Sequence, residues 1–136
     1  MGDTLLNCAK NNLPLRYSLL KHYYSIFVMA RGIGSIYNPL LYIFPLDDNN
    51  YKDEIADTQF MVGDSLMGAP ILNQGETSRE VYFSTINWYD LHTGKKYQAN
   101  STAQLTNITL TNKLPIFLRE GKIILSQDQI SARNTK

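Results

Sequence analysis

Between residues 60 and 125 the sequence is a series of short apolar runs separated by turn signals. Two of these turns are Asn73-Gln74-Gly75 and His92-Thr93-Gly94, in which a glycine follows polar residues. Short strands joined by tight turns are typical of an antiparallel β-sandwich, in which the strands bury one another. We therefore predict strands over residues 60–62, 66–72, 81–83, 88–91, 105–110, 116–118 and 123–125.

The beginning of the chain has the period of an α-helix. Large apolar side chains recur there at spacings of three and four, namely Tyr17, Leu20, Tyr24 and Phe27. This spacing places them on one face of a helix. Pro14 suits a first helical turn and Gly32 can end a helix in the left-handed conformation, which predicts a helix over residues 14–31.

Five apolar or aromatic residues then stand between two prolines, as Leu40-Leu41-Tyr42-Ile43-Phe44. A run without alternation is typical of a strand that is buried on both faces, as in a parallel sheet covered by helices. One helix and one such strand cannot cover each other completely. We therefore predict the end of an α/β unit joined to a small all-β module, with the covering partners outside this chain.

Charge and cysteine content exclude several classes of function. The 13 basic and 12 acidic residues are spread along the chain, so no basic surface for nucleic acid is indicated. No apolar run approaches the roughly 20 residues that span a bilayer. A single cysteine, Cys8, excludes an internal disulfide and every multi-cysteine metal motif. We expect no cofactor and no bound metal.

Two other sequence patterns suggest a functional site, but the neighbouring residues argue against both. The Asp and Asn residues of segment 47–57 suggest a calcium loop, but Tyr51 and Lys52 interrupt the alternation of ligands, which favours a solvated loop. Asp64-Ser65 after Gly63 suggests a nucleophile elbow, but Met67 stands where the closing glycine belongs. The histidines available as a base, His22 and His92, lie in no obvious catalytic context.

Several segments taken together, in this order, resemble glycoside hydrolase family 31, the family of the α-glucosidases. The matching segments are Leu15-Arg16-Tyr17-Ser18-Leu19-Leu20, Pro39-Leu40-Leu41 with Phe44-Pro45, Gln59-Phe60-Met61-Val62-Gly63, Trp88-Tyr89-Asp90 with Thr93-Gly94, and Ile116 to Ile124. The chain departs from the family pattern at Asn38, where many members have arginine, and at Lys21, where proline is usual.

The resemblance implies the last helix and last strand of a (β/α)8 barrel, followed by the antiparallel β-sandwich that is the family's proximal C-terminal domain. On this basis residues 1–58 are the incomplete end of the catalytic barrel and residues 59–136 are the sandwich. The family hydrolyses α-glycosidic bonds with retention, using aspartates on earlier barrel strands. We therefore assign no catalytic residue to this chain, and the resemblance identifies no substrate-binding residue in it.

The expected function is that of a piece of a retaining glycoside hydrolase for α-glucosidic bonds, inactive alone. Its expected partners are the remainder of the barrel and, in the parent enzyme, an α-glucoside or oligosaccharide. One alternative is a non-catalytic β-sandwich that binds carbohydrate through exposed Trp88 and Tyr89, although large aromatics more often pack between sheets. Another is a docking module that associates with a full-length enzyme.

Two N-glycosylation sequons are present, Asn100-Ser101-Thr102 and Asn107-Ile108-Thr109. The resemblance implies a family whose members often work in the secretory pathway. We therefore expect a secretory, lysosomal or extracellular location for the parent protein, with a glycan on Asn100 or Asn107.

Overall fold

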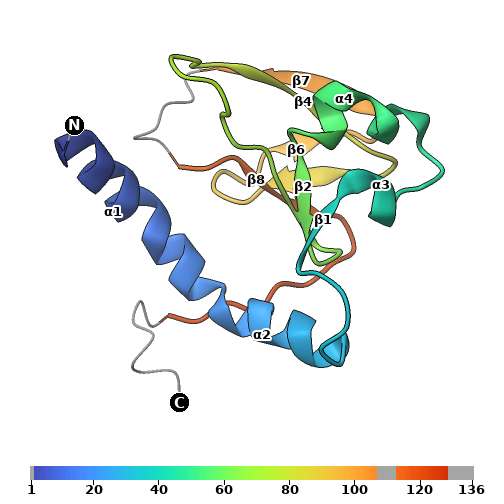
Figure 1. The fold of residues 1–136 in the computed structure, drawn as a ribbon, viewed down its shortest axis with the longest axis horizontal. Helices are drawn as coiled ribbons and strands as arrows, with labels where there is room; N and C mark the ends of the chain where they lie inside the picture. The colour runs from blue at the N-terminus through green and yellow to red at the C-terminus, as the bar shows by residue number, and fades with distance from the viewer. Residues whose placement is uncertain (1, 107–112, 129–136) are drawn as a thin grey trace.

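The computed structural model describes residues 2–106 and 113–128, and it begins with two helices that join end to end (Figure 1). Helix α1 (Gly2–Ser18) passes into α2 (Leu20–Met29) through Leu19, whose carbonyl oxygen accepts the backbone N–H of Tyr23 at 3.0 Å. After α2, Arg31 and Gly32 have φ angles of 52° and 74°. The helix therefore ends two residues before the predicted end at residue 31, and Gly32 takes the expected left-handed conformation. None of the described helices is both long enough and apolar enough to cross a membrane.

The predicted start of the helix is wrong, because the helix begins at Gly2 and Pro14 lies inside α1. The residues before Pro14 include good helix formers such as Leu5, Leu6 and Ala9. A proline removes one backbone donor from a helix, and here the helix continues on both sides of it.

The predicted strand over residues 40–44 is also wrong. Pro39 ends the three-residue strand β1 (Tyr37–Pro39), and the next residues form a single helical turn, α3 (Leu40–Ile43). Leu40 and Phe44, four residues apart, are buried on one side of this turn, whereas Tyr42 is 69% exposed. An apolar run does not by itself distinguish a buried strand from a buried helical turn, and burial at a spacing of four identifies the turn.

In residues 2–106 and 113–128 the strands are all antiparallel and form two sheets. One sheet has six strands in the order β1-β2-β3-β8-β5-β6, and the other pairs β4 with β7. The strands are β2 (Phe60–Val62), β3 (Leu66–Gly68), β4 (Arg79–Phe83), β5 (Trp88–Asp90), β6 (Lys96–Tyr97), β7 (Ser101–Leu105) and β8 (Ile116–Arg119). Two short helical turns, η1 (Asp48–Tyr51) and α4 (Asp53–Ala56), precede β2. The predicted antiparallel sandwich is thus confirmed.

Both faces of the six-stranded sheet carry apolar side chains. Met61, Met67 and Phe117 face one core, together with residues of β4 and β5 such as Phe83 and Trp88. Their alternating neighbours face a second cluster with the helices, as the two-residue period of a strand requires. These neighbours are Phe60, Val62, Leu66, Ile116 and Leu118. The described part of the chain therefore has three layers, with helices α1 and α2 on one side of the larger sheet and the β4–β7 pair on the other (Figure 1).

Most of the predicted strands agree with the structure to within two residues, but the short strands β1 and β6 are not among those predicted, and other strands differ. Strand β3 stops at Gly68 rather than at residue 72, and residues 123–125 are not a strand. Strand β7 occupies Ser101–Leu105, while most of the predicted strand 105–110 lies outside the described residues. The side chains of β7 are mostly polar, so hydrophobic pattern could not indicate it.

Candidate functional site

A buried carboxylate lies at the loop that follows α3. Asp47 is 8% exposed, and its Oδ2 accepts hydrogen bonds from the hydroxyls of Tyr82 at 2.8 Å and Ser84 at 2.5 Å. Its Oδ1 accepts from the backbone and side-chain nitrogens of Asn49, at 3.2 and 3.3 Å. The prediction of a solvated loop is therefore wrong for Asp47, which ties the loop to β4.

These hydrogen bonds determine the charge of Asp47. Burial alone would raise its pKa, but the hydrogen bonds from Ser84, Tyr82 and Asn49 together hold the pKa below the ordinary value of 3.8. The neighbouring Asn50 is fully buried and donates to the Phe44 carbonyl and to Ser84 Oγ, both at 3.1 Å. Because hydrogen-bond donors already surround the carboxylate, Asp47 is suited to a structural role rather than to that of a reacting acid.

A second buried contact joins α2 to the turn between β2 and β3. His22 Nε2 lies 2.8 Å from Ser65 Oγ, and the two residues are 6% and 3% exposed. Burial lowers the pKa of His22, and the nearby Asp64 carboxylate opposes this shift. The sequence placed these two residues 43 positions apart, so no local pattern could reveal the contact.

A serine hydroxyl beside a neutral imidazole is the usual start of a nucleophile pair. A substrate cannot reach this pair, however, because both side chains are buried between α2 and the sheet. Asp64 is more exposed and forms an ion pair with Lys122 rather than a contact with His22. The arrangement therefore holds the helix on the sheet and does not form a triad.

Other carboxylates shape a turn or lie in solvent. Asp90 Oδ1 accepts the backbone N–H groups of His92 and Thr93, both at 2.8 Å, and so shapes the turn after β5. Glu54 and Glu80 line one groove of about 480 Å³ near Tyr82, and both are exposed. Glycoside hydrolysis needs two carboxyl groups whose environments differ. Two solvated glutamates do not meet that requirement.

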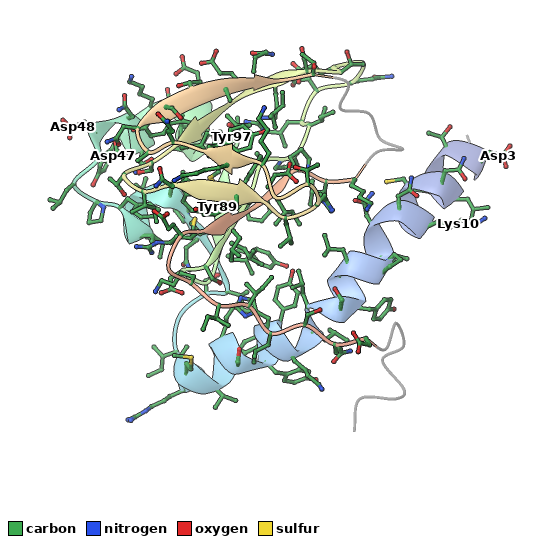
Figure 2. All side chains as sticks on the ribbon, turned by 180° about the vertical axis from the view of Figure 1, so that it is seen from behind. Asp3, Lys10, Asp47, Asp48, Tyr89 and Tyr97 are labelled. Atoms are coloured by element: carbon green, nitrogen blue, oxygen red, sulfur yellow. The ribbon has the colours of Figure 1, made fainter. Side chains whose placement is uncertain are left out.

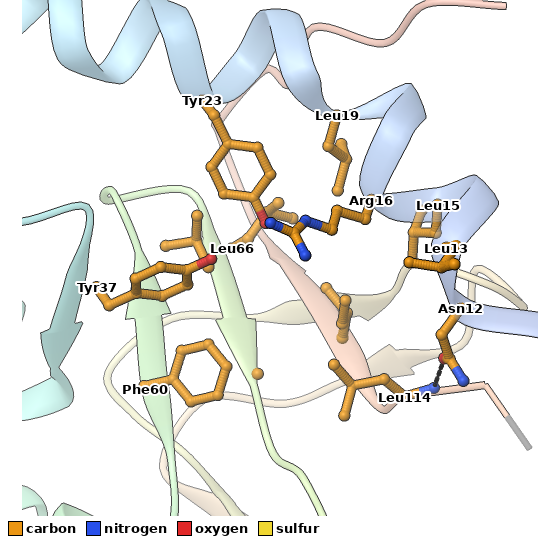
Figure 3. A pocket seen from close by; sticks show the side chains of 13 residues that line it. Asn12, Leu13, Leu15, Arg16, Leu19, Tyr23, Tyr37, Phe60, Leu66 and Leu114 are labelled. Atoms are coloured by element: carbon orange, nitrogen blue, oxygen red, sulfur yellow. Dashed lines mark hydrogen bonds between the residues drawn. The ribbon is translucent and has the colours of Figure 1, made fainter. Parts of the chain in front are cut away.

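An apolar cleft of about 340 Å³ lies between the helices and the sheet (Figure 3). Leu15, Leu19 and Leu66 contribute to its walls, and Tyr23 and Tyr37 contribute rings 6.4 Å apart. Burial, followed by the hydrogen bond with Tyr37, raises the pKa of Tyr23 to about 12, so its hydroxyl stays neutral. Such a cleft can accept an apolar side chain of a neighbouring segment.

Trp88 is fully buried, stacks edge-on against Phe44 at 6.1 Å and donates from Nε1 to the Ser84 carbonyl at 3.1 Å. The interpretation of Trp88 as packing is confirmed, and an exposed Trp88 platform for sugar is wrong.

Among the described residues, no group of three or more His, Cys, Asp and Glu side chains gathers where a metal ion could bind. Asn100 is exposed, whereas Asn107 lies outside the described residues.

The candidate groups lie at different ends of the molecule. Asp47 and Asp48 are far from α1, on which Asp3 and Lys10 project away from the sheets (Figure 2). Nor do the acids singled out by sequence form one site, because Asp47 is bound by Tyr82 and Ser84 whereas Asp64 pairs with Lys122. The polar groups described above form buried contacts. The apolar surface around the helices is more accessible to solvent than these contacts.

Comparisons with known proteins agree with the architecture. Residues 34–124 match the model of the glycosyl hydrolase family 31 C-terminal domain. A lysosomal acid alpha-glucosidase of Tetrahymena pyriformis is 35% identical, over 90% of this chain and 14% of that protein. The chain thus spans about one seventh of the length of this curated relative.

Solved structures give the same result. A family 31 dextranase of Flavobacterium johnsoniae, complexed with isomaltotriose, matches with a TM-score of 0.72 and 27% identity, over 85% of this chain and 14% of that one. A glucosidase II alpha subunit matches with a TM-score of 0.74 and 28% identity, over 87% of this chain and 13% of that one. The antiparallel sandwich-like domain is therefore the one that these enzymes carry.

Proposed function

Because the chain belongs to glycosyl hydrolase family 31, we propose that it is the C-terminal part of a retaining enzyme that cleaves α-glucosidic bonds. The α-glucosidase named among its relatives supports this substrate class. In this proposal the chain contributes support to a catalytic barrel and does not contribute the two reacting carboxyl groups. An α-glucoside or oligosaccharide then binds to the complete enzyme.

The observation that carries the proposal is the exposure of large apolar side chains on the outer face of α2. Tyr24, Phe27 and Val28 are 68%, 52% and 75% exposed, although they are large and apolar. The opposite face of the same helix, with Tyr23 and Ile26, packs on the sheet. A helix that is apolar on both faces is normally covered on both.

The occupant of the uncovered face is the remainder of the catalytic barrel. Most of the length of the curated relative, of which this chain covers 14%, lies outside the matched part. Helices α1 and α2 would then be the last helical element of the barrel. The uncovered face of α2 therefore favours docking onto a partner, rather than sugar binding, as the role of the isolated chain.

The sequence divides the chain at residue 59, and we propose an earlier boundary. Strand β1 (Tyr37–Pro39) pairs with β2 in the same sheet, and the family match begins at residue 34. The β-domain would therefore start near residue 34, with the helices belonging to the barrel. The name of the Tetrahymena relative favours a lysosomal or other secretory location for the parent protein.

A chimera tests the proposal. This chain replaces the matching segment of the Tetrahymena enzyme, and hydrolysis of an aryl α-glucoside is measured. We expect the chimera to be active and the isolated chain to be inactive. Phe27→Asp on α2 should abolish the chimera's activity, whereas Leu72→Asp, at a similarly exposed apolar residue on the β-domain, should not.

Two results would contradict the proposal. One is a chimera that folds and remains active with Phe27→Asp, which would remove the docking role of α2. The other is hydrolysis by the repurified isolated chain that disappears in Glu80→Gln. That second result would place a catalytic carboxyl group in the groove beside Tyr82.

A further inference from the structure

Asn100 occupies a turn immediately before β7 and holds it in a defined conformation. Its φ angle is 52°, in the left-handed region that asparagine tolerates better than most residues. Its side-chain oxygen accepts the backbone N–H of Thr85 at 3.1 Å and lies 3.5 Å from the Tyr82 hydroxyl. Because a backbone N–H only donates, the atom that faces Thr85 must be the amide oxygen.

The other end of the same amide points away from these contacts. The residue is exposed, and no described residue accepts a hydrogen bond from Asn100 Nδ2. Other asparagines differ in this respect. The Nδ2 of Asn50 donates to Phe44 and Ser84, and the Nδ2 of Asn87 donates to Glu120 at 2.8 Å.

The sequence around this amide is an acceptor sequence, Asn100-Ser101-Thr102, and Thr102 is exposed on β7. We propose that Asn100 is an N-glycan acceptor in which the sugar occupies the outward nitrogen and the oxygen keeps its bond to Thr85. This inference does not depend on the proposed role in α-glucoside hydrolysis.

The transfer needs a lipid-linked oligosaccharide pyrophosphate as the donor. A bond forms between Asn100 Nδ2 and the anomeric carbon of the first sugar, and the bond from that carbon to the phosphate oxygen breaks. The amide proton passes to a base of the transferring enzyme, and the lipid pyrophosphate leaves with the electron pair. Nitrogen loses one of its two hydrogens, and the oxygen that accepts from Thr85 is unchanged.

The position gives the glycan a physical role. In the described part of the chain β7 pairs only with β4, and a two-stranded sheet with an open edge is a template for pairing with other chains. A branched sugar at the residue before β7 lies at one end of this two-stranded sheet. It therefore hinders association of edge strands without altering a contact of the fold.

The test directs the full chain, with a cleavable leader, into the secretory pathway of a eukaryotic host. Peptides from all chains in the lumen, whether released or retained, are treated with glycosidase in heavy-oxygen water and analysed by mass spectrometry. We expect the label on Asn100 in the wild type. Thr102→Val should remove it, Thr102→Ser should retain it, and Thr109→Val, in the other sequon, should retain it.

An unlabelled Asn100 in the wild-type chain would overturn the proposal, whether or not Asn107 is labelled. A second measurement tests the geometry. Thermal unfolding of the wild-type protein before and after enzymatic deglycosylation should give a Tm that is not lower in the glycosylated form. A glycosylated form that melts earlier would mean that the sugar displaces the Thr85 contact, and would contradict the assignment of the outward nitrogen.

Discussion

The helical layer and the β-domain have comparable supplies of apolar side chains, but they use them differently. In the part of the chain that the structure describes, α1 buries none of its residues and α2 buries only His22. The sheets bury Met61, Phe83, Trp88 and Phe117 in one core. The difference shows that the β-domain has its own interior, whereas the helical layer packs on the sheet through one face and leaves the other exposed.

Replacing a core residue should give the largest effect. Trp88→Ala removes a fully buried side chain from between the sheets, and such a change costs roughly 3–5 kcal/mol of unfolding free energy. Phe27→Ala, on the outer face of α2, should change it by less than about 0.5 kcal/mol. Urea unfolding followed by circular dichroism measures both. Equal losses in the two variants would mean that α2 is part of the same core.

The buried carboxylate should give the next largest effect. Asp47→Asn disturbs hydrogen bonds from Tyr82 and Ser84 and should cost roughly 1–3 kcal/mol, because buried donors lose their acceptor. Asp48→Asn, at the exposed neighbour, should cost less than about 0.5 kcal/mol.

The acid dependence of stability should identify the same residue. Because the folded pKa of Asp47 lies below 3.8, its contribution is complete above pH 3.8 and is lost as the pH falls through the folded value. Unfolding free energies of the wild type should therefore fall more steeply in acid than those of Asp47→Asn. Parallel acid profiles would show that the carboxylate makes no specific contribution.

Self-association should show a smaller effect that is confined to the helical layer. We expect the isolated chain to form dimers or larger species in sedimentation experiments, because Phe27 and Val28 on α2 are exposed. Phe27→Asp should shift the population toward monomer, and the matched control Leu72→Asp should not. A monomeric wild type at high concentration would indicate that the outer face of α2 is not adhesive.

The smallest expected effect is that acidification weakens the contact between α2 and the sheet. The pKa of folded His22 lies below 6.5, so the neutral ring stabilises the α2–sheet contact fully above pH 6.5, and this is lost as the pH falls through the folded value. The nearby Asp64 carboxylate, which is itself paired with Lys122, opposes this shift without reversing it.

Hydrogen exchange measures this loosening. Opening free energies of α2 amides should decrease below pH 6.5 in the wild type and not in His22→Gln, while the strands remain protected. His92→Gln, in which the other histidine is replaced, should behave as the wild type. Loosening of α2 in His22→Gln on acidification would assign the effect to another group.

Sequence predicted the β-domain better than the helical layer for a physical reason. Strands such as 60–62 and 116–118 alternate between two apolar layers and end at tight turns, so local pattern reports their structure. The apolar stripe from Tyr17 to Phe27 is real, but its Tyr24 and Phe27 lie on the outer face, while Leu19 and Ile26 meet the sheet. A helix that is apolar on both sides does not reveal which side is covered.

The polar contacts could not be predicted because they depend on long-range placement. Asp47 stands in a segment whose composition favours solvent, and only the tertiary position of Tyr82 and Ser84 explains its burial. The resemblance identified the family correctly. It did not identify the helical turn at Leu40, because a motif records residue types and not backbone conformation.

The order of strands has a consequence for how the protein is made. Strand β8 (Ile116–Arg119) lies between β3 and β5 and pairs with both, although it is synthesised after every other strand that the structure describes. Leu66 on β3 faces Leu118 on β8, across more than fifty intervening residues. Until β8 emerges from the ribosome, β3 and β5 each present an unpaired edge. The described sheet therefore stays in two parts until residue 119 has left the ribosome, and both parts can then pair with β8.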